Sequence, residues 1–189
     1  MVKSTDFPYR RVVVVGTTGS GKSTLAEKLA KQTNRAFIEL DELKWLPGWV
    51  SRPDEEFRAL VEVATEQTGW VLAGNYRVVR DITWKKADTI IWLDYPFHIN
   101  LWRLLFRTVR RSWTRELLWG TNYEDFWKQL KLWDRQESIF RWFFDSYWYR
   151  KSEFPRLFKQ AEHAHLQVIH LTNPRDTDAW IDGLAAEVR

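Results

Sequence analysis

The 189-residue sequence has no cysteine, and none of its apolar segments is long. Without cysteine the chain can form no disulfide and offers no thiolate to a metal ion, which suits a reducing compartment. The valines from Val12 to Val15 are too few for the core of a signal peptide, and no window approaches the ~18 apolar residues of a membrane span. We therefore expect a cytoplasmic protein without a membrane partner.

Charge is unevenly distributed along the chain. The formal net charge is +4, yet residues 103–159 hold 13 basic and 7 acidic side chains. Such a segment is attracted to polyanions, either nucleotide phosphates or nucleic acid. Solvated helix faces explain the same charges and are the favoured interpretation.

Tryptophan is unusually frequent, with 13 residues in the chain. Seven of them fall between residues 97 and 160, in a segment that is helical in pattern. We expect most of these rings to pack as the core of that segment, and stacking on a ligand is the alternative.

Short apolar runs alternate with helical segments. The runs at 12–15, 36–40, 70–73, 89–93 and 167–171 have the length and branching of buried strands. Helices are predicted between them, because parallel strands need crossovers. The sequence therefore predicts an α/β three-layer sandwich with a parallel five-stranded sheet. It also predicts one domain over residues 1–189, with a helical lid insertion at about 108–150.

The stretch GTTGSGKST follows the first predicted strand and precedes the first predicted helix. Its spacing, G-x-x-x-x-G-K-S, is that of a P-loop, in which glycines let backbone N–H groups converge on phosphate oxygens at a helix N-terminus. Lys22 is expected to reach the β- and γ-phosphates, and the Ser23 hydroxyl is a hard ligand suited to Mg²⁺. The predicted nucleotide-binding residues are Gly16, Thr17, Thr18, Gly19, Ser20, Gly21, Lys22, Ser23 and Thr24.

Three further stretches follow the P-loop: LDELKWLPGW (40–49), LAGNYR (72–77) and TIIWLD (89–94). Asp94 is followed by Arg103 and Arg107 in a D-x8-R-x3-R spacing. With these features, which cover about half of the chain, the sequence resembles the adenylate-kinase-like P-loop kinases. Among them it looks most like the DNA topology modulation proteins. The resemblance implies a P-loop NTPase fold of the nucleotide-kinase type.

The resemblance also implies an activity and roles for three arginines. ATP with Mg²⁺ would donate its γ-phosphoryl group to a nucleotide or a similar small acceptor. Arg103 would lie over the nucleotide base, Arg107 would contact phosphate, and Arg77 would bind the acceptor's phosphate. Further lid candidates, each interpreted first as a solvated surface arginine, are Arg110, Arg111, Arg141 and Arg150.

Two aspartates and one alanine bear on the chemistry. Asp41 is expected to hold Mg²⁺ through water or to accept the acceptor's proton, and the alternative is a helix N-cap. Asp94 has the pattern of a Walker B acid, but the resemblance places it in a structural role near the hinge. The family usually carries Asp-Gly where this chain has Ala73-Gly74. Either Asp41 or Asp94 compensates, or the enzyme is slow, or the fold serves nucleotide binding alone; we expect Ala73→Asp to raise turnover or Mg²⁺ affinity.

The acceptor is less defined by the sequence. Arg52 could pair with an acceptor phosphate, and Trp45 and Trp49 could cover a base or sugar ring, although an ordinary packed turn explains them as well. The leading hypothesis is a Mg²⁺-ATP-dependent kinase of a small molecule. A nucleotide-regulated nucleic-acid-binding protein and a silent nucleotide sensor are the alternatives. The absence of an NKxD stretch argues against a GTPase.

Overall fold

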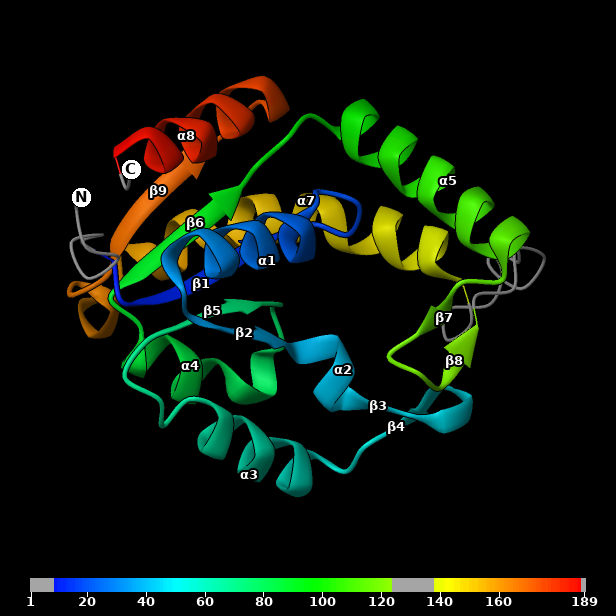
Figure 1. The fold of residues 1–189 in the computed structure, drawn as a ribbon, viewed down its shortest axis with the longest axis horizontal. Helices are drawn as coiled ribbons and strands as arrows, with labels where there is room; N and C mark the ends of the chain where they lie inside the picture. The colour runs from blue at the N-terminus through cyan, green and yellow to red at the C-terminus, as the bar shows by residue number, and fades with distance from the viewer. Residues whose placement is uncertain (1–8, 124–137, 188–189) are drawn as a thin grey trace.

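The computed structural model describes residues 9–123 and 138–187. Its central feature is a five-stranded sheet in the order β2-β5-β1-β6-β9, in which every pairing is parallel (Figure 1). All five predicted strands are therefore confirmed, and so is the α/β class. The strands are β1 (Arg11–Gly16), β2 (Ala36–Glu39), β5 (Trp70–Ala73), β6 (Thr89–Leu93) and β9 (Gln167–Leu171).

Helices and short hairpins connect these strands. The helices are α1 (Lys22–Thr33), α2 (Leu40–Lys44), α3 (Asp54–Ala64), α4 (Arg80–Lys86), α5 (Phe97–Thr114), α7 (Ile139–Phe158) and α8 (Pro174–Glu187), with 3₁₀ turns at η1 (Pro47–Trp49), η2 (Arg77–Val79) and η3 (Ala161–His163). The hairpins pair β3 (Trp45–Leu46) with β4 (Val50–Ser51), and β7 (Leu117–Leu118) with β8 (Asn122–Tyr123). No described helix is both long and apolar enough to cross a bilayer.

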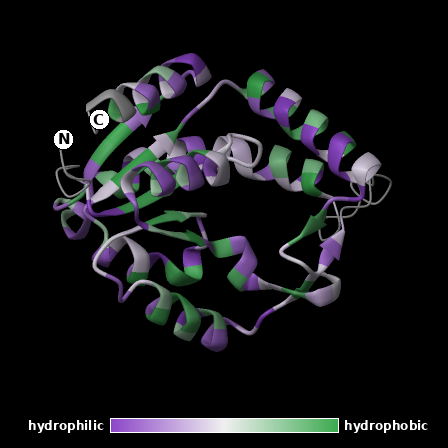
Figure 2. Ribbon diagram, in the orientation of Figure 1, coloured by the Kyte–Doolittle hydropathy of each residue, from purple (hydrophilic) through white to green (hydrophobic). Residues whose placement is uncertain are grey.

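Two apolar layers sandwich the sheet. On one face Val13 and Val15 of β1 pack with side chains of α3, α4 and the end of α7. On the other face Val12 and Val14 pack with side chains of α1 and α8. Because both faces are covered, the central strands β1 and β6 carry continuous β-branched runs without polar alternation. Figure 2 shows this contrast between the apolar strands and the mixed helices.

The strand order fixes where a ligand can bind. From β1 the chain moves to β2 at one edge of the sheet and back to β5, and then to β6 and β9 on the other side of β1. In open α/β sheets the crevice beyond the carboxyl ends of the strands, where this direction changes, is the usual ligand site. The loop from Gly16 to Gly21 leaves β1 at this edge.

The segment between β6 and β9 is only partly as predicted. α5 and α7 are helical, but a β-hairpin lies between them, and residues 124–137 fall outside the described part of the predicted lid. The expectation that its tryptophans form a core is wrong for most of the described ones. Exposed fractions are 70% for Trp102, 87% for Trp113, 50% for Trp142 and 65% for Trp148. Trp127 and Trp133 lie outside the described residues.

Candidate active site

The P-loop connects β1 to α1 by a backbone path that requires glycine. At Gly16 the φ angle is 155°, and a Cβ there would lie 2.6 Å from the Leu93 carbonyl oxygen. At Gly19 the φ angle is 82°, and a Cβ would lie 2.5 Å from the Asn100 carbonyl oxygen. A side chain at either position would collide with backbone, so the loop keeps a tight curve against β6 and α5.

Lys22 lies at the first position of α1. Its Nζ donates to the Thr17 carbonyl oxygen at 2.9 Å, which spans the mouth of the loop. Burial and the nearby Arg150 guanidinium lower the Lys22 pKa to about 8, while Asp41 and Glu39 oppose the shift. Arg107 also lies close enough to lower this pKa, so three cations gather at one point.

α5 holds the P-loop from the opposite side. Asn100 is fully buried, and its amide donates to the Thr17 hydroxyl at 2.9 Å and to the Tyr95 carbonyl at 3.0 Å. Arg103 follows one turn later; its guanidinium donates to the Ser20 carbonyl at 3.3 Å and lies 5.6 Å from the Tyr95 ring centre. The predicted base-binding arginine is therefore beside the loop.

Two carboxylates face the loop from the end of β2. Asp41 lies in the first turn of α2, whose N-cap residue is Glu39, so Asp41 is not the cap. Its carboxylate accepts a hydrogen bond of 2.6 Å from the Tyr76 hydroxyl. The indole N–H of Trp45 is in turn hydrogen-bonded to Tyr76, so Asp41 is held at the end of a short relay.

Glu39 was missed by sequence reasoning. It is buried, and burial followed by repulsion from Asp41 raises its pKa to about 7, while a hydrogen bond from Ser23 and the charge of Lys22 oppose the shift. In the sheet register Glu39 is the partner of Ala73. Its carboxylate therefore lies near the place where an aspartate at position 73 would project. The missed signal was the glutamate two residues before Asp41 in a β2 strand that is otherwise apolar.

Arg150 is the second residue whose role the sequence understated. It comes from α7, donates to the Gly16 carbonyl at 3.4 Å and lies 5.4 Å from the Trp142 ring centre. Burial lowers the pKa of its guanidinium, while the Asp41 and Glu153 carboxylates act in the opposite direction. Glu153 itself pairs with Arg80 at 3.1 Å, so a buried network supports Arg150.

The other predicted arginines lie elsewhere. Arg110 and Arg111 pair with Glu116, and Arg141 pairs with Asp145 four residues on. Arg77 lies exposed at the start of η2, and its binding of an acceptor phosphate stays a prediction.

Asp94 already has two partners. Its carboxylate lies 3.2 Å from Lys151 Nζ and 3.1 Å from the His170 ring. Replacing the missing aspartate would require Asp94 to leave these partners, whereas Glu39 and Asp41 lie close enough to Lys22 to raise its pKa.

The residues at the loop suit Mg²⁺ bound with ATP. The buried Ser20 hydroxyl has no hydrogen-bond partner among the residues that the structure describes, and a Cβ on Gly16 would approach it to 2.8 Å, so this oxygen points into the cradle. Ser23 and Thr24 lie exposed in the first turn of α1. Ser23 would hold Mg²⁺, with Glu39 and Asp41 reached through water, since these are hard oxygen donors. Within the described ranges no three His, Cys, Asp or Glu side chains converge as a metal site, so the ion would depend on nucleotide phosphates.

Two hairpins meet beside this site and form what we call the hairpin clasp: β3–β4 with η1, and β7–β8. The Trp49 ring lies between Trp45 and Trp119, at 5.8 and 5.7 Å between ring centres. The side-chain amide of the buried Asn122 accepts a hydrogen bond from the Trp49 backbone N–H at 2.9 Å and donates to the Leu46 carbonyl at 3.2 Å. Trp49 and Trp119 both have positive φ angles, of 61° and 47°. Strained backbone of this kind persists where the surroundings impose it.

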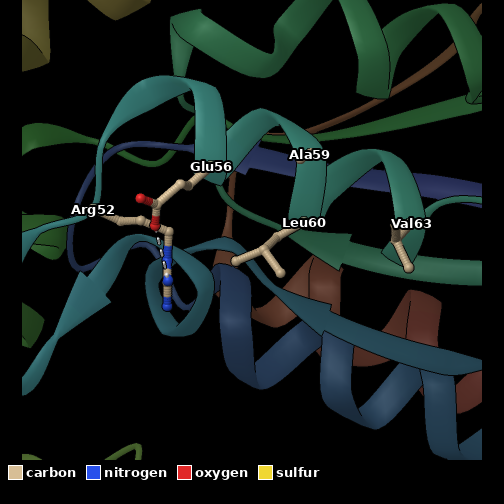
Figure 3. Close-up of a pocket in the computed structure, with 5 residues that line it drawn as sticks. All are labelled: Arg52, Glu56, Ala59, Leu60 and Val63. Carbon is tan, nitrogen blue, oxygen red and sulfur yellow. Dashed lines mark ion pairs between the residues drawn. The ribbon is translucent and has the colours of Figure 1, made fainter.

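A shallow apolar hollow lies on α3, on a different part of the molecule. Figure 3 shows Arg52, Glu56, Ala59, Leu60 and Val63 around it. Arg52 is engaged there: its Nε donates to the Leu43 carbonyl at 2.8 Å, and its guanidinium lies 3.6 Å from Glu56. Binding of an acceptor phosphate by Arg52 would require it to leave these partners.

Comparisons with known proteins agree with this architecture. A family model described as "ATPase family associated with various cellular activities (AAA)" matches residues 12–94, from β1 to the end of β6. The HslU ATPase subunit of an ATP-dependent protease from Nitrobacter hamburgensis is 41% identical over 61 residues, 31% of this chain. Its counterpart from Nitrobacter winogradskyi is 38% identical over 61 residues. The matched region is 14% of the length of each relative.

Two solved structures are similar over nearly the whole chain. A shikimate kinase from Acinetobacter baumannii in complex with shikimate has a TM-score of 0.52 at 17% identity, over 98% of this chain and 96% of that one. A gluconokinase from Sinorhizobium meliloti 1021 has a TM-score of 0.51 at 17% identity, over 95% of each chain. The chain therefore has the P-loop NTPase fold, in the arrangement seen in these two proteins. The narrower resemblance to DNA topology modulation proteins stays a prediction.

Proposed function

We propose that the chain is an ATP-dependent kinase that transfers the γ-phosphoryl group of Mg²⁺-ATP to a hydroxyl or phosphate group of a small molecule. The observation that carries the proposal is the meeting of Lys22, Arg150 and Asp41 at the mouth of the P-loop. The match of residues 12–94 to an ATPase family supports ATP as the nucleotide. The shikimate kinase and the gluconokinase that share this fold support the type of reaction.

Each side chain has a task that follows from phosphoryl transfer. The transition state spreads negative charge over the γ-phosphoryl oxygens, so fixed positive groups stabilise it. Lys22 follows the loop directly, and Arg107 and Arg150 arrive from α5 and α7. Mg²⁺, when bound with ATP, neutralises phosphate charge and orients the phosphates.

Asp41 would act on the acceptor. Its carboxylate is fixed by the Tyr76 hydroxyl and keeps a second oxygen for an incoming hydroxyl group. A carboxylate in this position accepts a hydrogen bond from the attacking oxygen and removes its proton as the bond to phosphorus forms. The hairpin clasp, with Trp45 connected to Tyr76, would form the wall on the acceptor side.

The proposal is tested with a panel of acceptors. The protein is incubated with Mg²⁺-ATP and, separately, nucleoside monophosphates, sugars, sugar acids and other polyols, and products are analysed by mass spectrometry. We expect one chemical class to gain a phosphoryl group, with loss of product in Lys22→Met and Asp41→Asn. ATP hydrolysis at one slow rate with every acceptor, unchanged in Asp41→Asn, would contradict the kinase assignment while leaving nucleotide binding intact.

A further inference from the structure

α5 carries two apolar rows, and only one of them is buried. Phe97, Leu101, Leu104 and Leu105 pack against Phe140, Phe143 and Tyr147 of α7, as the apolar stripe of a surface helix normally does. Beside this row, Asn100 bonds to Thr17 and Leu104 lies against Gly19, so the same side of the helix faces the P-loop. The second apolar row lies on the side of α5 that points away from the protein.

The exposed side of α5 carries four large apolar side chains. Trp102, Phe106, Val109 and Trp113 are 70%, 67%, 42% and 87% exposed. Their spacings of four, three and four residues place them in one line along the helix, which we call the α5 stripe. At 1.5 Å per residue the stripe is roughly 16 Å long. In Figure 1 α5 lies at the periphery of the molecule, and Figure 2 shows its alternating apolar and polar residues.

Positive charge accompanies the stripe. α5 contains four arginines and no acidic residue. Arg110 is exposed on one border of the stripe, whereas Arg103 on the same border reaches the Ser20 carbonyl and belongs to the candidate active site. The nearest acidic residue in the chain is Glu116, which pairs with Arg110 and Arg111 beyond the end of the helix. The partner of the stripe must therefore accept apolar rings and offer negative charge beside them.

We propose that the α5 stripe is a docking surface for the headgroup region of an anionic lipid bilayer. Tryptophan and phenylalanine bury their rings at the boundary between headgroups and acyl chains, and Val109 between them adds aliphatic surface. Arg110 would exchange its surface ion pair with Glu116 for lipid phosphates, which gives the contact its preference for anionic lipids. The helix then lies along the surface and does not span it.

Two other occupants fit the stripe less well. A second copy of the chain would bring two arginine-rich helices face to face, and like charges in contact oppose association. Single-stranded nucleic acid is usually bound in a groove that follows its backbone, with successive bases stacked on rings. Here the rings stand on the convex side of one helix, and Val109, which offers no ring, interrupts them.

The test uses the full chain and vesicles of defined composition. Sedimentation is measured with phosphatidylcholine vesicles and with vesicles that also contain phosphatidylglycerol. We expect binding to the anionic vesicles, weakened by added salt, and more than about tenfold weaker in the double variant Trp102→Ala/Trp113→Ala. Trp148→Ala is the matched control, because this tryptophan is 65% exposed but lies on α7 against Phe97.

Circular dichroism shows whether the variants are folded, and an ATP titration shows whether their nucleotide site is intact, so the result does not depend on the proposed kinase activity. Wild-type protein that ignores anionic vesicles, or a double variant that binds them as well as wild type, would overturn the proposal. A concentration-dependent dimer that the double variant abolishes would assign the stripe to a second copy. Single-stranded DNA bound through these tryptophans, without vesicle binding, would assign it to nucleic acid; either result also overturns the lipid proposal.

Discussion

Replacing Arg150 with methionine tests how α7 contributes to the site. The substitution removes a guanidinium that donates to the Gly16 carbonyl at 3.4 Å and lies close to Lys22 and Asp41. Methionine retains much of the apolar stem, so the change is chiefly one of charge. Removing one preorganised donor to a transition-state charge typically costs about 10²- to 10³-fold in kcat, or about 3–4 kcal/mol.

The same substitution should also raise the pKa of Lys22. The Arg150 charge helps to lower the Lys22 pKa to about 8, so without it the pKa should rise toward the ordinary 10.5, although burial will still hold it below that value. Lys22 binds phosphate in its charged form, which is lost as the pH rises through its pKa. ATP affinity in the wild type should therefore begin to fall near pH 8, and in Arg150→Met the fall should begin at a higher pH.

The assay combines initial rates at saturating ATP with ATP titrations between pH 6 and 10. Arg141→Met is the matched control, because Arg141 lies on the same helix but pairs with Asp145 at the surface. A wild-type kcat in Arg150→Met would show that Arg150 does not act on the transferred phosphoryl group. An alkaline fall in ATP affinity at the wild-type pH would show that it does not act on Lys22.

Three further substitutions follow from the carboxylates and the hairpin clasp. Glu39→Gln should weaken Mg²⁺-ATP binding, yet stabilise the ligand-free protein at pH 8 by up to about 3 kcal/mol. Burial raises the Glu39 pKa to about 7, so the wild type loses stability as the pH rises from 4.5 through that value. Urea unfolding at pH 4 and pH 8 checks this, and an equal effect of the substitution at both pH values would contradict it. Ala73→Asp, which the sequence predicts to raise turnover or Mg²⁺ affinity, also places a second carboxylate beside Glu39, its strand partner, and should therefore lower stability; adding Glu39→Ala should restore stability, and unchanged turnover and Mg²⁺ affinity in Ala73→Asp would contradict the prediction. Asn122→Ala leaves the Trp49 backbone N–H and the Leu46 carbonyl without this partner, so we expect the free energy of unfolding to fall by about 1–3 kcal/mol. The KM for the acceptor should rise with little change in ATP affinity. A rise in KM confined to ATP would show that the hairpin clasp does not contact the acceptor.

The fold was predictable because its signals are local. The central strands β1 and β6 are short β-branched runs buried on both faces, and the P-loop spacing between β1 and α1 fixes the conformation of that turn. The five predicted strands and the parallel arrangement are confirmed for this reason. The two short hairpins were missed, because two-residue strands leave no periodicity to detect.

The site was predictable only where its residues adjoin a motif. Lys22 and Ser23 belong to the P-loop spacing, and Arg103 and Arg107 follow β6 at a recognisable interval. Arg150 comes from a helix 134 residues away from Gly16, and it differs from the surface arginines of the same segment only in tertiary contacts. Nothing in the sequence distinguishes Glu39 from other polar residues, because its place beside Ala73 follows only from the sheet register.

The central claim is that the P-loop and Lys22 bind the phosphates of a nucleoside triphosphate. Calorimetric titration of the full chain with Mg²⁺-ATP tests it most directly, with Lys22→Met as the comparison. We predict saturable binding heat for the wild type and its loss in Lys22→Met, whose circular dichroism stays that of the wild type. No heat with ATP, GTP or their diphosphates, or equal heat for the two proteins, would contradict the account.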